Sequence, residues 1–291
     1  MKPPVFNYLA PRSLEQALAM LGQYGDAAKI LAGGQSLVPA LNFRLAFPEY
    51  LIDLNGIEAL QQVSFQDDGS FTAGALTRHR FFELSRRIKQ YWPLLHHAVQ
   101  SIAHVQIRNR GTIGGSLSHA DPSAEWPALC LVCDAVMVIA GDRGERSVSA
   151  VDFSKGLFTT AMGPDEILVR IVFPAPAKRQ GWGFQEVARR TGDFAIVGAT
   201  CLLDLDDEGV CDRARVVIFG ASDRPILMTD AATALVGTRL EAEAINQAAM
   251  LASSSIVCRA DQQASAEYRQ ALVKTLTARA LAQAATKRGL R

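Results

Sequence analysis

Hydrophobic and polar residues follow three successive patterns along the chain, and the first pattern covers residues 1–57. Leucines at helical spacing after Ser13 predict an amphipathic helix that begins near that residue. Short apolar runs at 28–32 and 50–54 predict two buried strands, and the segment 36–45 between them predicts a helix. The first part of the chain is therefore predicted to form a small β-α-β unit.

The second pattern begins with alternating hydrophobic and polar residues, which are typical of half-buried strands. Turn residues at 67–70 and 141–144 predict two β-hairpins, and an apolar run at 166–173 predicts one more strand. Longer segments with a 3.6-residue period predict helices between these strands. The predicted hairpins pair 60–65 with 71–75 and 135–140 with 146–149, and the predicted helices cover 78–88, 93–103 and 125–133.

A stretch with proline and glycine, 174–181, predicts a linker to the third pattern. Beyond it come three strand-like runs and then a region with helical spacing. The predicted strands cover 183–190, 195–204 and 210–219, and the predicted helices cover 230–236, 241–253 and 265–285. The predicted fold class is α+β, and the last part is expected to be an antiparallel sheet with helices. We place the boundaries between three parts at 1–57, 58–176 and 177–291.

Two glycine-containing segments, 32–45 and 112–125, are candidate binding sites. Each has a strand-like approach, a Gly-Gly pair, a hydroxyl residue and then a stretch that can start a helix. Because glycine permits φ above 0° and close approach of a ligand, successive N–H groups in such a turn can form an anion-binding concavity. Neither segment has the glycine spacing of the dinucleotide-binding Rossmann motif or of the P-loop. The alternative is an ordinary tight turn in which Ser36, Thr112 and Ser116 cap the following helix.

Charge and composition exclude several functional classes. The 291 residues carry a formal net charge of +1, which gives no electrostatic footprint for nucleic acid or an anionic membrane. The longest apolar run, 128–140, contains Asp134 and is too short to span a bilayer. The N-terminus lacks the apolar core of a signal peptide, and the five cysteines lack the spacing of a disulfide framework. We therefore expect a cytoplasmic protein with reduced thiols and no membrane insertion.

Cys130 and Cys133 have the Cys-x-x-Cys spacing that is found in redox and metal sites. No second pair accompanies them, whereas a zinc or iron–sulphur site normally takes four ligands. Because leucine and valine surround both residues in a predicted helix, we interpret them as buried core thiols. The histidines lack metal-ligand spacing as a set, and no nucleophile–base–orienter arrangement is found. We predict neither a metal site nor catalytic residues in this chain.

Three short motifs occur in an order that resembles one family of flavoproteins. The motifs are Ala32-Gly-Gly-Gln-Ser36, Thr112-Ile-Gly-Gly-Ser116 and Arg189-Arg-Thr-Gly-Asp-Phe-Ala195. With these motifs the chain resembles, over nearly its whole length, the FAD-binding medium subunit of the molybdenum hydroxylases, which include carbon monoxide dehydrogenase and xanthine dehydrogenase. The resemblance implies a two-lobed, PCMH-type FAD-binding domain, followed by a C-terminal domain of the carbon monoxide dehydrogenase flavoprotein type.

The resemblance also implies which residues contact FAD, which we expect to be bound without a covalent link. The diphosphate would be lined by Leu31, Ala32, Gly33, Gly34, Gln35, Ser36, Thr112, Ile113, Gly114, Gly115 and Ser116. Ile102 would pack on the flavin ring, and Glu125 would reach the adenosine ribose. The positions near the adenine and the isoalloxazine edges would be Ile167 or Leu168, and Gln185. Asp193 and Phe194 would lie at the flavin face, although a phenylalanine at a strand start can also be a plain core residue.

The function implied by the resemblance is electron transfer within a larger complex. A large molybdopterin-binding subunit would oxidise the substrate, a small subunit would relay electrons through two [2Fe–2S] clusters, and FAD in this chain would pass them to an acceptor. We expect a dimer of such heterotrimers. Two alternatives stay open: a stand-alone flavin-dependent oxidoreductase, and a nucleotide-binding assembly or scaffold protein without a redox role. The substrate and the acceptor stay open as well.

Overall fold

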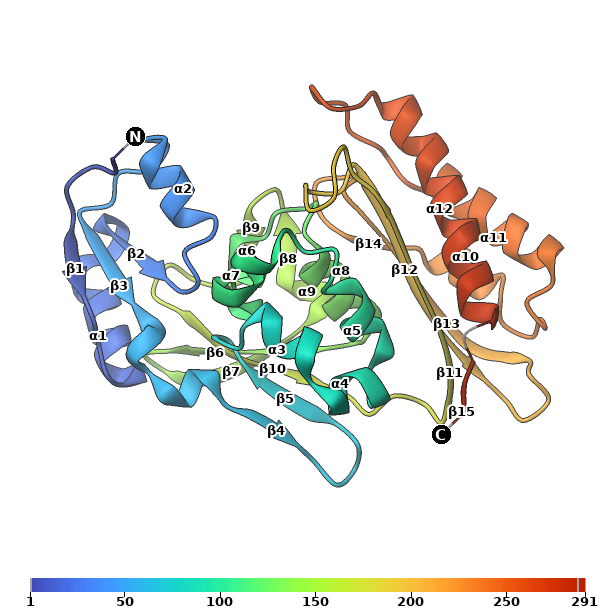
Figure 1. The fold of residues 1–291 in the computed structure, drawn as a ribbon, viewed down its shortest axis with the longest axis horizontal. Helices are drawn as coiled ribbons and strands as arrows, with labels where there is room; N and C mark the ends of the chain where they lie inside the picture. Colours follow the sequence, from blue (N-terminus) through green and yellow to red (C-terminus); the bar gives the residue numbers. More distant parts are fainter. Residues whose placement is uncertain (1, 287, 291) are drawn as a thin grey trace.

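The computed structural model describes residues 2–286 and 288–290, with side chains over 2–286. Three larger β-sheets follow one another along the chain, and Figure 1 shows them from the blue N-terminal part at the left to the orange and red C-terminal part at the right. The first sheet is parallel, and the second and third are antiparallel. Together with the helices around them, these sheets confirm the predicted α+β class.

The first sheet confirms the predicted β-α-β unit. Its strands, in spatial order, are β1 (Asn7–Leu9), β3 (Tyr50–Asp53) and β2 (Ala28–Leu31). Helix α1 (Leu14–Tyr24) joins β1 to β2, and its N-cap is Ser13, whose hydroxyl accepts a hydrogen bond from the Gln16 N–H at 3.2 Å. The predicted helix 36–45 is shorter than expected, because α2 (Leu37–Asn42) ends before Arg44, which has a φ of 56°. Short 3-10 helices cover Gly25–Ala27, Leu54–Gly56 and Glu58–Gln61.

The second sheet contains both hairpins that the alternating pattern predicted, with the strand predicted over 166–173 between them. Its strands, in spatial order, are β4 (Val63–Phe65), β5 (Phe71–Gly74), β10 (Ile167–Phe173), β6 (Val136–Gly141) and β7 (Gly144–Ser149). Strand β4 starts later than predicted because a 3-10 helix occupies the residues before it. A separate small hairpin, which the sequence did not predict, consists of β8 (Ser154–Gly156) and β9 (Thr159–Thr160).

Short helices between these strands depart from the prediction at several points. They are α3 (His79–Leu84), α4 (Arg86–Tyr91), α5 (Pro93–Ala98), α6 (Val105–Arg110), α7 (Ile113–His119), α8 (Glu125–Val132) and α9 (Ala150–Phe153). The predicted helix 78–88 breaks at Ser85, whose extended backbone starts a new helix and whose hydroxyl accepts from the Ile88 N–H. The predicted helix 93–103 ends early, and Ala103 has a φ of 44°, which a helix cannot contain. Helix α6 was not predicted.

The third sheet and its helices agree with the predicted antiparallel arrangement. Its strands, in spatial order, are β14 (Ile226–Leu227), β13 (Cys211–Phe219), β12 (Val197–Leu205), β11 (Arg179–Val187) and β15 (Arg288–Leu290). Strand β11 begins inside the predicted linker, which therefore ends at residue 178. The helices are α10 (Thr229–Thr233), α11 (Ala242–Ser255) and α12 (Ala266–Thr286), and Figure 1 shows them on the side of the sheet away from the second sheet.

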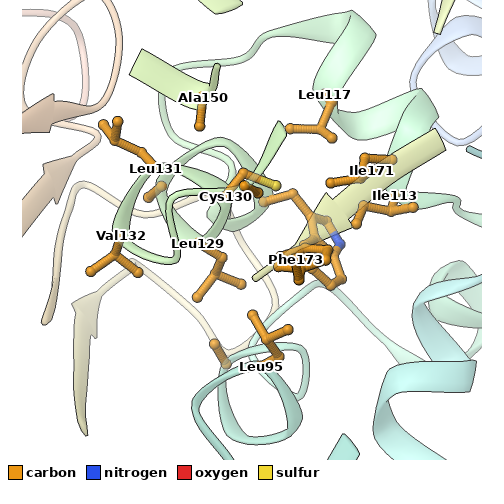
Figure 2. Packing of buried hydrophobic residues seen from close by; sticks show 14 of the residues in the cluster. Leu95, Ile113, Leu117, Leu129, Cys130, Leu131, Val132, Ala150, Ile171 and Phe173 are labelled. Atoms are coloured by element: carbon orange, nitrogen blue, oxygen red, sulfur yellow. The ribbon is translucent and has the colours of Figure 1, made fainter. Parts of the chain in front are cut away.

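One hydrophobic cluster joins the second sheet, its helices and the third sheet. Phe71 of β5 stacks on Phe173 of β10, with ring centroids 4.6 Å apart. Phe184 of β11 and Phe219 of β13 belong to the same cluster. Figure 2 shows part of it, where side chains of α5, α7 and α8 converge on Phe173. Because apolar surface from both parts is buried together, the third sheet has a fixed place against the helices of the second part.

Candidate cofactor-binding site

The structure brings the two predicted glycine segments together. The first glycine segment (residues 32–36) connects β2 to α2, and the second glycine segment (residues 112–116) begins at the N-cap of α7. In Figure 1, α2 and the end of β2 face α6 and α7 across the boundary between the blue and green parts of the chain. The two motifs are far apart in sequence, so this proximity comes from the tertiary fold.

Gly33 and Gly115 make the close approach possible. A Cβ atom on Gly33 would lie 2.7 Å from Gly111 Cα and would also clash with the carbonyl oxygen of Arg110. A Cβ atom on Gly115 would point toward the first glycine segment, 3.5 Å from Ala32 Cβ. The contact at Gly33 is with backbone atoms, which cannot rotate away as a side chain can. A side chain at position 33 would therefore push the two segments apart.

The first glycine segment presents a row of free backbone donors. Within the described part of the chain, no acceptor receives a hydrogen bond from the N–H groups of Gly33, Gly34, Gln35 and Ser36. Gly34 has a φ of 74°, which glycine adopts without a steric penalty and which is typical of backbone that turns N–H groups around an anion. Gln35 stabilises the loop by donating from Nε2 to the Gly33 carbonyl at 3.0 Å. This arrangement suits a diphosphate.

A cavity of about 300 Å³ lies beside these donors. Arg110 lines this cavity, whereas Arg108 is committed to Glu83, with 2.9 Å between Nε and Oε2. The lining residues are Leu31, Ala32, Gly33, Gly34, Gln35, Val38, Pro39, Asn42 and Arg110. Backbone donors beside a single arginine can hold an anion mainly through their N–H groups. The residues present therefore fit a dinucleotide diphosphate.

The second glycine segment is not the turn ahead of a helix that the sequence predicted. It forms the first turn of α7, and its N-cap is Thr112, whose hydroxyl accepts from the Gly115 N–H at 3.0 Å. The N–H groups of Ile113 and Gly114 donate to carbonyl oxygens just beyond β5, at 3.0 and 2.8 Å. These donors are committed inside the protein. The two glycine segments therefore differ, and only the first offers a row of free N–H groups.

Gly114 allows α7 to pack on the sheet. A Cβ atom at this position would lie 2.5 Å from Ala75 Cβ, so a side chain here would collide with the end of β5 instead of entering the cavity. Ser116 is half-buried, and its hydroxyl has no hydrogen-bond partner among the residues that the structure describes. The second segment can thus contribute a hydroxyl and a close-packed wall.

Predicted flavin-face residues meet where the loop between β11 and β12 packs on the second part of the chain. A Cβ atom on Gly192 would lie 2.9 Å from His104 Cε1, so this loop touches the segment that carries Ile102. The Asp193 N–H donates to the Arg190 carbonyl at 3.1 Å and closes the turn. The structure therefore brings the positions predicted at the flavin face near one another.

Phe194 is not a core residue, because its side chain is 51% exposed. The alternative of a plain core phenylalanine at a strand start is therefore wrong. Phe194 lines a second cavity, of about 130 Å³, together with Asp121 and Ser123, which follow α7. An exposed aromatic ring at the edge of a cavity is available to stack on a planar ligand.

The predicted contact residues that line neither cavity are Ser36, Ile102, Thr112, Ile113, Gly114, Gly115, Ser116, Glu125, Ile167, Leu168, Gln185 and Asp193. Ile167 and Leu168 lie in β10 and are 3% and 4% exposed, so their side chains belong to the core. Gln185 donates from Nε2 to Gln283 Oε1 in α12 at 2.9 Å. Ile102 is likewise buried, with 8% exposed, and belongs to the hydrophobic cluster that joins the second and third sheets, so Ile102, Ile167, Leu168 and Gln185 all contact protein in the structure.

Glu125 begins α8 and is buried with a 5% exposed side chain. Burial and the neighbouring carboxyls of Glu186 and Asp121 raise the pKa of Glu125 to about 8. Burial also raises the pKa of Glu186 to about 7, and its Oε2 has no hydrogen-bond partner among the described residues. With this raised pKa the carboxyl of Glu125 favours the protonated form at neutral pH, in which it can both donate a hydrogen bond to a sugar hydroxyl and accept one.

Asn55 contacts the first glycine segment, and Arg78 links Asn55 to Arg110, two residues before the second glycine segment; neither Asn55 nor Arg78 was predicted from the sequence. Asn55 donates from Nδ2 to the Ala32 carbonyl at 2.8 Å, and Arg78 donates to Asn55 and to the Arg110 carbonyl. Asn55 comes just after the carboxyl end of β3, where binding residues collect in open α/β sheets, and this position is a signal that could have found it. Arg78 carries no comparable local signal.

Cys130 and Cys133 are protonated thiols at neutral pH. Burial raises the pKa of Cys130 well above its ordinary value and that of Cys133 to about 12. Over residues 2–286, no group of three or more His, Cys, Asp or Glu side chains is placed to hold a metal ion. None of the described helices has the length and apolar character needed to cross a membrane.

Two family models together match nearly the whole chain. The model described as FAD binding domain in molybdopterin dehydrogenase matches residues 4–176. The model described as CO dehydrogenase flavoprotein C-terminal domain matches residues 182–284.

Individual relatives are similar to this chain over nearly their whole length. The 6-hydroxypseudooxynicotine dehydrogenase complex subunit alpha of Paenarthrobacter nicotinovorans is 40% identical over 98% of this chain and 96% of its own. A solved carbon monoxide dehydrogenase chain from Hydrogenophaga pseudoflava is 35% identical, with a TM-score of 0.96 over 99% of this chain and 100% of its own. Quinoline 2-oxidoreductase from Pseudomonas putida 86 contains a chain that is 39% identical, with a TM-score of 0.92 over 98% of both chains. The chain therefore belongs to the FAD-binding medium subunits of the molybdenum hydroxylase family.

Proposed function

We propose that this chain binds FAD non-covalently and serves as the electron-transfer subunit of a molybdenum-containing hydroxylase or dehydrogenase. The observation that carries the proposal is the row of free N–H groups from Gly33 to Ser36, beside a cavity with one arginine in its wall. When bound, FAD supplies a carrier that takes up electrons and passes them to an external acceptor. The work of the protein is then to bind and orient the cofactor and to set its environment.

The proposed contacts fall into groups by the part of FAD that each would meet. The first glycine segment donates N–H groups to the diphosphate, and the second provides the Ser116 hydroxyl and a close-packed wall. Ile102, Asp193 and Phe194 border the flavin ring, and Glu125 meets the ribose. The complete proposed set is Leu31, Ala32, Gly33, Gly34, Gln35, Ser36, Ile102, Thr112, Ile113, Gly114, Gly115, Ser116, Glu125, Ile167, Leu168, Gln185, Asp193 and Phe194.

The proposed partners are a large molybdopterin-binding subunit and a small subunit with two [2Fe–2S] clusters, in a dimer of heterotrimers. In support, one relative is named a complex subunit and another a medium chain. Two clusters ligated by four cysteines each require more cysteines than the five in this sequence, so the clusters are assigned to a partner. We further propose domain boundaries at 57/58 and 176/177, with a cytoplasmic location.

FAD titration of the purified full chain tests the proposal. We expect one FAD per chain, with quenched flavin fluorescence on binding and release of free FAD when the protein is denatured in acid. Flavin that stays with the denatured chain would contradict non-covalent binding. A folded chain that takes up no FAD would favour the alternative of an assembly or scaffold protein.

A further inference from the structure

The side chains of Asn55 and Arg78 link the first glycine segment to the residues just before the second one. All of these hydrogen bonds are within the protein. Asn55 donates from Nδ2 to the Ala32 carbonyl at 2.8 Å, and Arg78 donates from Nη2 to Asn55 Oδ1 at 2.5 Å. The other terminal nitrogen of Arg78 donates to the Arg110 carbonyl, which adjoins the second glycine segment. We infer that Arg78 and Asn55 form a clasp that fixes the spacing of the two glycine segments and thereby sets the affinity for the FAD diphosphate.

The clasp depends on the shape of the arginine side chain. A guanidinium group is planar and presents its donors in a rigid fork, so the two acceptors that it binds are held at a defined separation. One of these acceptors belongs to the residue that holds the first glycine segment, and the other belongs to the backbone against which Gly33 packs. A lysine has the same charge but donates from a single nitrogen on a flexible stem. Lysine therefore cannot reproduce the spacing.

Asn55 is itself held in place from the first sheet. Asp53 Oδ1 accepts hydrogen bonds from the Asn55 backbone N–H at 2.9 Å and from Asn55 Nδ2 at 2.5 Å. The other carboxylate oxygen of Asp53 accepts from the Tyr8 hydroxyl at 2.5 Å. A continuous series of hydrogen bonds thus runs from β1 through the end of β3 to Arg78. The clasp is anchored in the first sheet as well as in the second part of the chain.

Arg78 and Arg110 have different tasks. Arg110 lines the cavity, whereas Arg78 is half-buried and does not line it. Burial and the nearby Arg110 guanidinium lower the pKa of Arg78, while Asp53 raises it. Because the guanidinium of Arg78 donates to two protein oxygens, it is a positioning residue, and Arg110 is the cation that can face the anion.

The inference rests on the proposed FAD function, and FAD titration of full-length variants tests it. The variants are Arg78→Ala, Arg78→Lys, Asn55→Ala and the Asn55→Ala/Arg78→Ala pair. Loss of a charge-assisted hydrogen bond typically weakens binding roughly 10- to 100-fold, and we expect this increase in the FAD Kd for each single variant. The matched control is Arg80→Ala, because Arg80 lies in α3, whose N-cap is Arg78, and pairs with Glu83 at 2.8 Å instead of with Asn55 or Arg110.

The pattern among the variants separates positioning from charge. We expect Arg78→Lys to bind FAD almost as weakly as Arg78→Ala, and the double variant to be no weaker than about the worse single variant, since both changes open the same clasp. If Arg78→Ala does not fold, the FAD Kd values of Arg78→Lys and Asn55→Ala test the inference instead. Wild-type affinity in Arg78→Lys, or fully additive losses in the double variant, would overturn the inference.

Hydrogen exchange in the cofactor-free chain gives a readout that does not depend on FAD. Amides of β2 should exchange faster in Arg78→Lys than in the wild type and should be unchanged in Arg80→Ala. If the wild type binds no FAD while this difference persists, the proposed function fails, and only the role of the clasp in fixing the spacing of the glycine segments stands. If the wild type binds FAD while exchange and Kd in the clasp variants equal those of the wild type, the clasp fails and the proposed function stands.

Discussion

Gly33→Ala is the smallest change that should open the proposed diphosphate site. A Cβ atom at this position would lie 2.7 Å from Gly111 Cα and against the Arg110 carbonyl, both of which are backbone atoms. Gly33 is not among the residues with a positive φ, so alanine causes no backbone strain there. The predicted effect therefore comes from the collision, which must push the two glycine segments apart.

The size of the expected loss of FAD affinity follows from the steric overlap of the Cβ atom at position 33 with the backbone. An ordinary Cβ contact lies at 3.4 Å or more, so the backbone around Gly111 must move by several tenths of an ångström. Overpacking of a close-packed interior typically costs about 1–3 kcal/mol. Where the same displacement misaligns the N–H groups, a loss of this size raises the FAD Kd by roughly 5- to 150-fold.

The assay is fluorescence titration of the cofactor-free chain with FAD, combined with thermal unfolding. Gly22→Ala is the matched control, because Gly22 lies exposed in α1 and a Cβ atom there would meet no atom within 4 Å. Alanine in place of glycine stabilises a helix by up to about 1 kcal/mol, so Gly22→Ala should unfold at a slightly higher temperature with unchanged FAD affinity. A Gly33→Ala protein that binds FAD as tightly as the wild type would refute the role assigned to this contact.

Three further changes have defined outcomes. Phe194→Ala removes a ring that is 51% exposed, so the fluorescence or the reduction potential of the flavin should change. The free energy of unfolding in urea should stay within about 1 kcal/mol of the wild type. Unchanged flavin properties would show that Phe194 does not contact the flavin ring. Arg269→Ala leaves the Ile196 and Gly220 carbonyls and Asp261 without their buried partner, so the free energy of unfolding should drop by about 3–5 kcal/mol. The control is Arg279→Ala on the same helix, which should have little effect because Arg279 is exposed. The pKa of Glu125 is about 8 in the folded chain against an ordinary 4.5, so the folded state retains a proton that the unfolded state has lost; the free energy of unfolding should therefore fall as the pH rises from about 5 to 8. Glu125→Gln should make that fall smaller, and an unchanged pH profile would contradict the buried, protonated carboxyl.

Local sequence patterns predicted most of the elements and much of the candidate site. The β-α-β unit, both hairpins of the second sheet and the long C-terminal helix follow from periodicity and turn residues. The free N–H groups of the first glycine segment were predicted from its glycines. Helix breaks at Ser85 and Ala103 were missed, because each depends on the backbone conformation of a single residue that the apolar period does not reveal.

The remaining features depend on contacts between distant segments. Gly114 is needed because Ala75 lies against it, and Thr112 caps a helix whose first N–H groups point to carbonyls beyond β5. No local pattern distinguishes that use of glycine from an anion site. The link between Asn55 and Arg78 likewise joins residues from two parts of the chain, so only the fold reveals it.

The most direct test of electron transfer by this chain compares its FAD-loaded form alone with the same chain in its purified native complex. Each sample is mixed without oxygen with a candidate aromatic or N-heterocyclic substrate, and the flavin absorbance is followed. We expect bleaching only in the complex, which should contain two further kinds of chain together with molybdenum and iron. Bleaching of the isolated, metal-free chain by the substrate would show a self-sufficient flavoenzyme and would contradict the account.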